Sequence, residues 1–323
     1  SDVCSSDLFE LIEYKEEEGV SIEPHYFLPI LPAVLLNGSS GIAVGFATNI
    51  LNRNPIDVIK ACKNVINGRK VTLLKPYNKF FKGDYIQDTE NNKKWYIRGK
   101  FNRKNTTTVE ITELPPSMTY EKYDAILEKL LDDKVIVSYE DNCKDDINYT
   151  IKFTRNALSE LSDDNLIKVF KLEETSTEIF TTLDENGKMK IFDTVDEIVK
   201  YFVNFRIGYY VKRKNHRIKK LNDELLVLSN KSRFIKAILD GKLEIKNKPK
   251  SEIISGCEKL KLDKMNDSYD YLLRMPLWSL TKELFDKLMK DHKDKVKELE
   301  DYKKIEPKNM YLSELDDLLK LLK

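Results

Sequence analysis

The longest regular pattern of apolar positions in the chain lies between Val195 and Leu239. This stretch has no proline and a single glycine, Gly208, and its apolar residues recur at alternating steps of three and four. They are Val211, Ile218, Leu221, Leu225, Leu228, Ile235 and Leu239, and Lys214 and Ser232 fill the two gaps in the stripe. The spacing predicts a heptad seam on one long helix, which at 1.5 Å per residue would span on the order of 65 Å. A helix of that length needs a partner.

The partner is expected at Thr281–Ile305, where a second stripe recurs at helical spacing. Its members are Phe285, Leu288, His292, Val296, Leu299 and Tyr302. Between the two stripes, Gly241, Pro249, Gly256 and Pro276 interrupt a stretch of short helices. The pattern therefore predicts an ascending coiled-coil helix (194–240), a small helical knob (241–276), and a returning helix followed by a C-terminal helix (277–323).

Residues 51–193 have the mixed pattern of an α+β domain. Asn54 and Pro55 are a cap and a first helical residue, and they predict a helix to about Asn67. Thr119 is expected to cap a second helix that runs to about Leu131, and an Asn186-Gly187 turn predicts a hairpin between Ile179–Leu183 and Met189–Phe192. Further strands are expected near Gly83–Gln87, Trp95–Phe101, Thr106–Glu113, Val135–Tyr139 and Tyr149–Phe153. The fold class is thus α+β, with an antiparallel coiled coil after the mixed domain.

The stretch before residue 51 contains a candidate wedge, Ile42. Val34–Leu36 and Ile42–Phe46 are short apolar runs, and we expect two buried strands around an Asn37-Gly38 turn. Small residues between the two runs let the backbone approach another molecule closely, and an isoleucine presented there can insert between base steps and kink a duplex. The alternative is an ordinary tight hairpin whose isoleucine belongs to the core. The candidate contact or support residues here are Asn37, Gly38, Ser39, Ser40 and Gly41.

Net charge gives no indication of a nucleic-acid partner, because 55 Lys and Arg residues balance 54 Asp and Glu residues. A local basic run, residues 206–220, contains no acid and includes two tyrosines. Such a helix end suits phosphate contact; the alternative is a solvated helix face balanced by the acidic stretches 173–178 and 223–224. The candidate contact or support residues of the run are Arg206, Lys212, Arg213, Lys214 and Arg217.

No catalytic or metal-binding motif is present in the sequence. The four cysteines and three histidines are scattered singly, which argues against a zinc site and is typical of a reducing compartment. Tyr14 and Tyr26, the only tyrosines before Ile42, lack a preceding arginine, and we interpret both as structural. The chain has neither a long apolar run nor a signal peptide, so we expect no membrane partner and a cytoplasmic location.

Four stretches, in order, resemble type IIA DNA topoisomerases. They are YFLPILPAVLLNGSSGIAVGFATNI (26–50), VEITELPP (109–116), the basic helix from Val195, and LRMPLWSLTKE (273–283) followed by YLSELDDLLKLL (311–322). The chain is similar to the A subunits of gyrase and topoisomerase IV, and more so to the medium subunit of large tailed phages, which would place it in the host cytoplasm. The resemblance covers nearly everything from Phe9 onward. Residues 1–8 read like a translated sequencing adapter and are excluded from it.

The resemblance implies an ATP-dependent enzyme that bends and cleaves one duplex and passes a second duplex through it. Residues 9–50 would be the end of the winged-helix domain and a junction hairpin, 51–193 the tower domain, and 241–276 the exit gate of a homodimer. Ile42 falls on the residue that intercalates in the family. Arg53 stands where gyrase A has the histidine of a Pro-Pro-His-Asn motif, and it would contact DNA phosphate or support the residues that do.

The resemblance also implies what this stretch of chain does not carry. The catalytic tyrosine and its arginine would lie upstream, and Mg²⁺ and ATP would bind elsewhere, on a TOPRIM/ATPase subunit or domain of the same topoisomerase. No catalytic residue and no metal ligand are therefore expected here. Two other interpretations stay open: a non-catalytic DNA-bending or dimerising coiled-coil protein, and a coiled-coil scaffold that never meets DNA.

Overall fold

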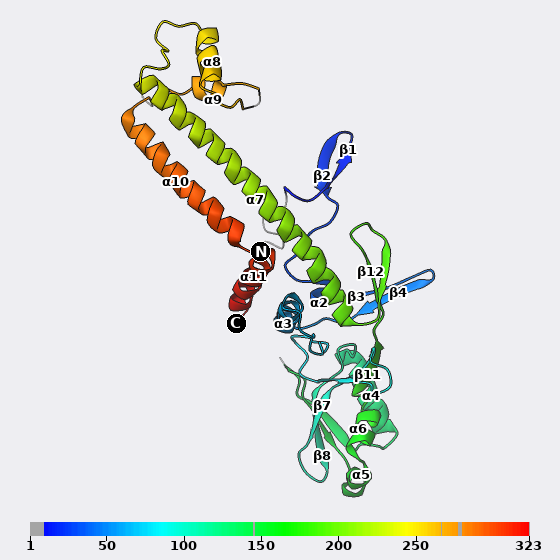
Figure 1. Ribbon diagram of the computed structural model, residues 1–323. Coiled ribbons are helices and arrows are strands. Elements are labelled where there is room, and N and C mark those ends of the chain that lie inside the picture. Colours follow the sequence, from blue (N-terminus) through cyan, green and yellow to red (C-terminus); the bar gives the residue numbers. More distant parts are fainter. Residues whose placement is uncertain (1–9, 145, 266, 277–279, 323) are drawn as a thin grey trace. The chain divides into compact units, whose positions relative to one another are not determined.

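The computed structural model describes residues 10–144, 146–265, 267–276 and 280–322. The chain divides into two compact units. One consists of residues up to Leu28 together with Phe205–Asp316, and the other of Pro29–Asn204 with Asp317–Lys323. The predicted adapter segment, residues 1–8, lies outside the described residues. Small sheets and one very long helix make this a mixed α and β fold (Figure 1), in agreement with the predicted class.

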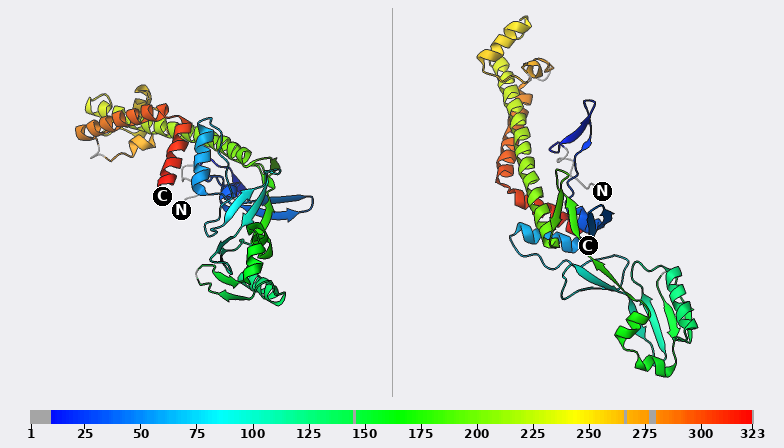
Figure 2. Two further views of the ribbon diagram at one scale, coloured as in Figure 1. Left: turned by 90° about the horizontal axis from the view of Figure 1, so that it is seen from below. Right: turned by 90° about the vertical axis from the view of Figure 1, so that its right-hand side faces the viewer.

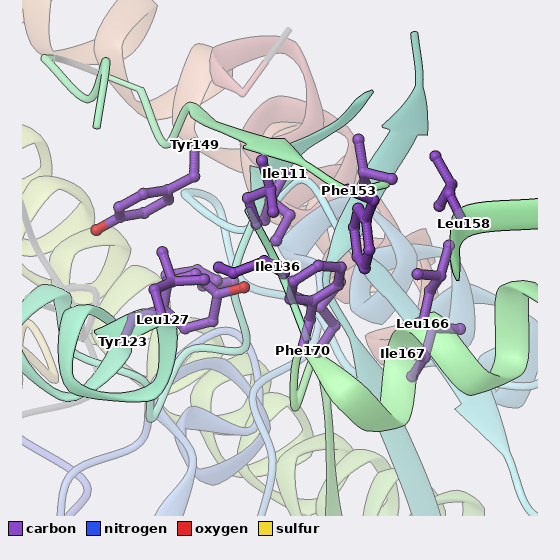
Figure 3. Packing of buried hydrophobic residues seen from close by; sticks show 14 residues of the cluster. Ile111, Tyr123, Leu127, Ile136, Tyr149, Phe153, Leu158, Leu166, Ile167 and Phe170 are labelled. Atoms are coloured by element: carbon purple, nitrogen blue, oxygen red, sulfur yellow. The ribbon is translucent and has the colours of Figure 1, made fainter. Parts of the chain in front are cut away.

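The second unit has its largest core around a four-stranded antiparallel sheet in the order β7-β8-β10-β9. These strands are β7 (Lys100–Arg103), β8 (Thr108–Glu113), β10 (Tyr149–Lys152) and β9 (Ser138–Asp141). Helices α4 (Tyr120–Asp132), α5 (Arg155–Glu160) and α6 (Asp163–Val169) pack against it. Figure 3 shows how Leu127, Phe153 and Phe170 fill the space between the sheet and the helices. As predicted, the Thr119 side chain caps α4, by accepting a hydrogen bond from the amide of Lys122.

A smaller antiparallel sheet holds the strands that the hairpin of Ile42 rests on. Its order is β11-β6-β5, with β11 (Glu173–Thr177), β6 (Lys94–Arg98) and β5 (Asp84–Gln87). The single strand predicted over 95–101 is wrong, because the chain leaves this sheet after Arg98 and enters the four-stranded sheet at Lys100. Gly99 permits the change, since a Cβ there would overlap the carbonyl oxygen of Glu113.

Two local signals predicted elements of the second unit correctly. Helix α3 (Pro55–Ile66) begins after Asn54, whose side chain accepts a hydrogen bond from the amide of Ile56 at 2.9 Å. Gly68 follows the helix with φ 70°. Strands β12 (Phe180–Leu183) and β13 (Met189–Phe192) form the predicted hairpin, and Gly187 takes φ 72° in its turn.

The first unit contains most of helix α7 (Val195–Leu239) and all of α10 (Lys282–Lys304). The two helices run side by side in all three views (Figures 1 and 2). Arg217 contacts Glu298 at 2.9 Å, and Glu224 contacts Lys295 at 2.7 Å. Between these two pairs the residue number increases on α7 and decreases on α10, so the helices are antiparallel. The predicted bounds 195–239 and 281–305 match these helices closely.

Three further parts complete the first unit. The short helices α8 (Lys250–Lys259) and α9 (Asp270–Leu273) share a small core with the end of α7, where Phe234, Cys257 and Leu272 are buried. Helix α11 (Pro307–Leu321) follows α10, and its residues up to Asp316 belong to the first unit. Near the N-terminus, β1 (Tyr14–Glu17) and β2 (Val20–Pro24) form a hairpin that the sequence pattern did not predict. Among the described residues, no helix combines the length and apolar character needed to cross a membrane.

Candidate nucleic-acid interface

The hairpin that carries Ile42 differs from the predicted one in its turn. Residues Ala33–Asn37 form the short helix α2, and the hairpin consists of β3 (Ser39–Ala43) and β4 (Phe46–Ile50). Gly38 ends α2 with φ 68°, and Gly45 makes the hairpin turn with φ 81°. The predicted turn at Asn37-Gly38 is wrong because a glycine after an asparagine serves equally as a helix C-cap.

Ile42 lies near the tip of this hairpin and is exposed. Its side chain is 94% accessible, that of Val44 in the turn is 101% accessible, and that of Phe46 is 51% accessible. The alternative in which Ile42 belongs to the core is therefore wrong. Ile42 pairs with Ala47 across the hairpin. Three large apolar side chains are thus exposed on the end of the hairpin (Ile42–Phe46, hereafter the hairpin tip), and exposed apolar patches mark binding surfaces.

The small residues singled out with Ile42 occupy the approach to the tip. Asn37, Ser39, Ser40 and Gly41 are exposed. Gly38 sits where α2 meets the end of β4: a Cβ there would come within 2.5 Å of the Asn52 side-chain oxygen and 2.8 Å of the Ile50 carbonyl oxygen. Close backbone approach at Gly38 thus serves the fold, while the exposed Ser39, Ser40 and Gly41 leave the β3 backbone open to a ligand.

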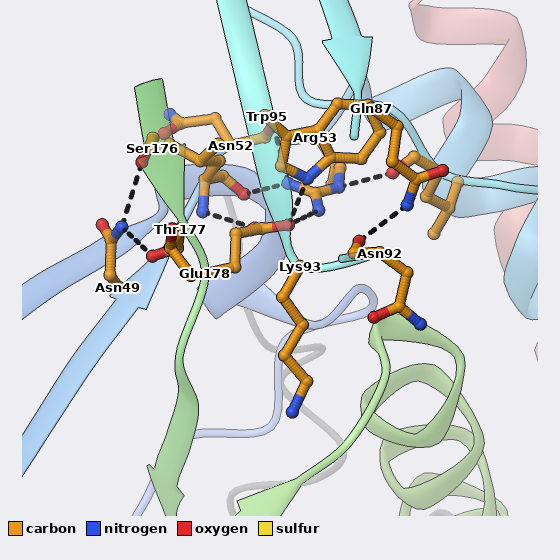
Figure 4. Close-up of polar contacts among 12 residues, drawn as sticks. Asn49, Asn52, Arg53, Gln87, Asn92, Lys93, Trp95, Ser176, Thr177 and Glu178 are labelled. Atoms are coloured by element: carbon orange, nitrogen blue, oxygen red, sulfur yellow. Dashed lines mark hydrogen bonds and ion pairs between the residues drawn. The ribbon is translucent and has the colours of Figure 1, made fainter. Parts of the chain in front are cut away.

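The base of the hairpin (residues 49–53, hereafter the hairpin base) is held by the β11 strand and the residues after it. The Asn49 side chain donates hydrogen bonds to the Thr177 carbonyl at 2.7 Å and the Ser176 hydroxyl at 3.1 Å. The backbone of Asn49 also exchanges hydrogen bonds of 3.0 and 2.9 Å with Ile179. Figure 4 shows the two hydrogen bonds from the Asn49 side chain to Ser176 and Thr177. Together with the contacts between β4 and β12, these hydrogen bonds hold the hairpin by its β4 strand.

Arg53, the last residue of the hairpin base, forms a buried ion pair with Glu178. Arg53 donates from Nη2 to Glu178 Oε2 at 2.7 Å, and the two side chains are each 1% exposed. The remaining guanidinium donors reach the carbonyl oxygens of Leu51 and Leu74, at 2.7 and 2.8 Å. The sequence led us to expect Arg53 at DNA phosphate. Its buried and hydrogen-bonded position fits the second role left open for it, support of the hairpin.

The basic run of α7 is largely engaged within the first unit. Arg213 contacts Glu314 at 2.5 Å, Arg217 contacts Glu298, and Lys214 donates to the Lys303 carbonyl at 2.7 Å. Hydrogen bonds from Lys220 and His216 lower the pKa of the Glu10 carboxyl. Lys212 is exposed and lies over the Tyr209 ring at 4.4 Å. The acidic partners are Glu10, Glu298 and Glu314, and the expected stretch 173–178 instead pairs with Arg53 and Arg98.

Arg206, the first residue of the run, is fully buried. It donates to the Leu28 carbonyl at 2.7 Å, and its guanidinium lies over the rings of Tyr210 and Tyr311 at 5.2 and 5.4 Å. Burial raises the pKa of the Tyr210 hydroxyl, and Glu314 adds to that rise. Like Arg53, Arg206 therefore fits a supporting role, joining α7 to α11 and to the segment before the hairpin.

The sequence patterns missed three residues of this interface. Glu178 and Trp95, which complete the buried cluster around Arg53, lie 125 and 42 residues from it in sequence. No local sequence pattern identifies either residue. The one hint is that the acid Glu178 directly precedes the apolar pair Ile179-Phe180 at the start of a strand. Val44 could have been found, because it lies inside the apolar run that was singled out. Among the described residues, no group of three or more His, Cys, Asp or Glu side chains is placed to hold a metal ion.

Comparison with known proteins defines the family. The sequence model of the A subunit of DNA gyrase/topoisomerase IV matches residues 2–316. The chain belongs to this family. It is 33% identical over 346 residues to DNA topoisomerase 2 of Plasmodium falciparum, a match that covers 95% of this chain and 24% of that protein. Mitochondrial DNA topoisomerase 2 of Dictyostelium discoideum is 31% identical over 325 residues, covering 97% of this chain and 25% of that protein.

A solved structure shares the fold. It is the crystal structure of the DNA-binding, cleavage and re-ligation domain of Plasmodium falciparum topoisomerase II, with a TM-score of 0.78 and 31% sequence identity. The match covers 99% of this chain and 48% of that chain. Since the chain spans about a quarter of the length of the two curated relatives, its similarity to them concerns that portion.

Proposed function

We propose that this chain is part of an ATP-dependent type II DNA topoisomerase and that it bends the duplex which the enzyme cleaves. The observation that carries the proposal is the exposure of Ile42, at 94%, near the tip of a hairpin whose β3 strand is exposed throughout. Insertion of an aliphatic side chain between base pairs unstacks them and kinks the duplex. The relatives are DNA topoisomerases, and the solved domain of similar fold is one for DNA binding, cleavage and re-ligation, which supports the same role.

The energetics explain why the wedge needs the rest of an enzyme. Burying an isoleucine side chain yields roughly 1.5–3 kcal/mol, whereas unstacking a base step costs a few kcal/mol. Insertion of Ile42 is therefore close to neutral by itself. Contacts with DNA phosphates must supply the remainder, and the exposed Lys212 and the open β3 backbone at Ser39, Ser40 and Gly41 are our candidates in this chain.

The remaining parts of the chain have proposed roles of their own. Residues 51–193 would form the tower domain that supports the bent duplex, and α7 with α10 a coiled coil within 194–240 and 277–323. The antiparallel contacts between Arg217 and Glu298 and between Glu224 and Lys295 support the coiled coil. In this proposal Mg²⁺ and ATP are bound by other parts of the whole enzyme, and neither takes part in the roles assigned to this chain. The relatives named above are eukaryotic, so similarity to phage enzymes stays a prediction.

A relaxation assay separates the enzyme from a non-catalytic DNA-bending or dimerising protein. We expect the full-length protein to relax supercoiled plasmid when ATP and Mg²⁺ are supplied, and to leave a covalent protein–DNA adduct when the reaction is quenched with denaturant. The 323-residue chain alone should do neither. A full-length protein that bends DNA but gives no relaxation and no adduct would support the non-catalytic alternative.

The knob (241–276) is proposed as the exit gate that joins two copies. We expect the 323-residue chain to sediment as a dimer at micromolar concentration. A variant in which a short Gly-Ser loop replaces residues 241–276 should be monomeric, because it lacks the proposed gate. It should still fold, because the α7–α10 ion pairs lie outside the replaced segment. A monomeric chain at that concentration, or a dimeric loop variant, would contradict the gate.

A further inference from the structure

Glu178 accepts hydrogen bonds from three donors, two of which belong to the hairpin base. Its Oε2 accepts hydrogen bonds from Arg53 Nη2 at 2.7 Å and Trp95 Nε1 at 2.9 Å, and its Oε1 accepts one from the Leu51 amide at 3.0 Å (Figure 4). Glu178 is 2% exposed, and Trp95 is 1% exposed. One buried carboxylate thus joins β6 to the residue that immediately follows β4 and to the arginine two positions further on.

Glu178 holds the hairpin at a point that lies several residues along the strand from the wedge residue Ile42. Ile42 pairs with Ala47, four residues before Leu51, which is roughly 13 Å of strand at 3.3 Å per residue. All five residues of β3 are exposed, and the hairpin contacts the rest of its unit through β4, which lies against β12, and through the hairpin base. A small rotation at Leu51 is therefore amplified at Ile42.

We propose that Glu178 is a positioning residue for the Ile42 wedge, an inference that rests on the proposed function. When Ile42 separates two base pairs, the stacked bases push back on the hairpin tip. Only if residues 49–53 of the hairpin base do not rotate can the hairpin transmit that force to the rest of the protein. A buried carboxylate with three donors is a rigid support, because charge-assisted hydrogen bonds are short and strong and water cannot replace them at this depth.

A second Arg–Glu pair in the same sheet provides a matched control. Glu173 and Arg98 are register partners on β11 and β6, and their side chains are 2.7 Å apart. Glu173 lies five residues before Glu178, pairs with Arg98 rather than with the hairpin base, and has a side chain that is 26% exposed. Loss of its charge should weaken the sheet without changing the hairpin.

The test is a double-mutant cycle on DNA bending in the full-length protein. The ratio of bent to straight bound duplex is measured by energy transfer between dyes at the two ends of a short duplex, at saturating protein. The variants are Ile42→Ala, Glu178→Gln and the double variant, with Glu173→Gln as the control. We expect Ile42→Ala to lower the ratio about thirtyfold, Glu178→Gln about tenfold, and the double variant to fall within about twofold of Ile42→Ala, because a wedge that is absent needs no support.

The outcomes separate this inference from the proposed function. If Ile42→Ala leaves bending unchanged, the wedge itself is refuted. If Ile42→Ala acts but Glu178→Gln matches Glu173→Gln, or if the two effects multiply, Glu178 is an ordinary core residue and the inference fails. Should Glu178→Gln not fold, Arg53→Lys takes its place: it keeps the charge but cannot reach Glu178, Leu51 and Leu74 at once, and the same coupling to Ile42 is expected.

Discussion

Replacing Glu178 with alanine is expected to lower the free energy of unfolding of the second unit by about 3–5 kcal/mol, the usual cost of breaking a buried ion pair. Arg53 cannot lose its charge, and its side chain is 1% exposed. The substitution would therefore leave a buried guanidinium without its counter-charge. It would also remove the acceptor for Trp95 Nε1 and the Leu51 amide.

Thermal unfolding checks this expectation. A loss of that size should lower the melting temperature of the unit by on the order of 10 °C. Glu173→Ala, which breaks a pair whose side chains are 33% and 26% exposed, should cost under about 1 kcal/mol. The double variant Arg53→Met, Glu178→Leu should recover much of the loss, because apolar groups of similar size can replace a buried pair. Equal melting temperatures for Glu178→Ala and Glu173→Ala would contradict the assignment of the pair.

The Ile42→Ala substitution is expected to weaken DNA bending while leaving folding and dimerisation intact. The change removes three carbon atoms from a side chain that is 94% exposed in the free protein, so the fold loses no packing. In the bent complex those atoms would be buried between bases. At about 0.8 kcal/mol per buried CH₂ group the loss is about 2 kcal/mol, or roughly thirtyfold in the bending equilibrium.

A matched control exists on another hairpin of the same chain. Ile22 on β2 is 55% exposed, so Ile22→Ala removes the same atoms from a comparable position without touching the hairpin tip. Cleavage of a duplex by the full-length protein should fall with Ile42→Ala, in parallel with bending, and should be unchanged with Ile22→Ala. Equal cleavage by both variants would remove the role of Ile42.

Elements with strong local signals could be predicted from the sequence alone. The stripe from Val211 to Leu239 and the absence of proline predicted α7, and Asn54-Pro55 and Thr119 predicted the starts of α3 and α4. Asn186-Gly187 predicted the turn between β12 and β13. In each case the deciding interaction lies within a few residues, so the pattern contains the information that sets the structure.

Features that depend on distant residues could not be predicted. Asn37-Gly38 is compatible with a hairpin turn and with the end of a helix. The structure has the helix, and Leu35 in it is fully buried, at 0% exposed. Glu178 meets Arg53 across 125 positions, so nothing local showed that Arg53, which the resemblance placed at DNA phosphate, pairs with an acid inside the fold. The same holds for the basic run of α7, whose partners Glu298 and Glu314 lie on α10 and α11.

The insertion of Ile42 between base pairs can be measured directly with 2-aminopurine, whose fluorescence rises when it is unstacked. The base analogue is placed in turn at each step of a short duplex bound to the full-length protein. We expect increased fluorescence at one step, or at two steps related by the twofold axis of a dimer, and loss of that increase with Ile42→Ala but not with Ile22→Ala. Fluorescence that stays low at every step, or that rises equally with Ile42→Ala, would contradict the wedge.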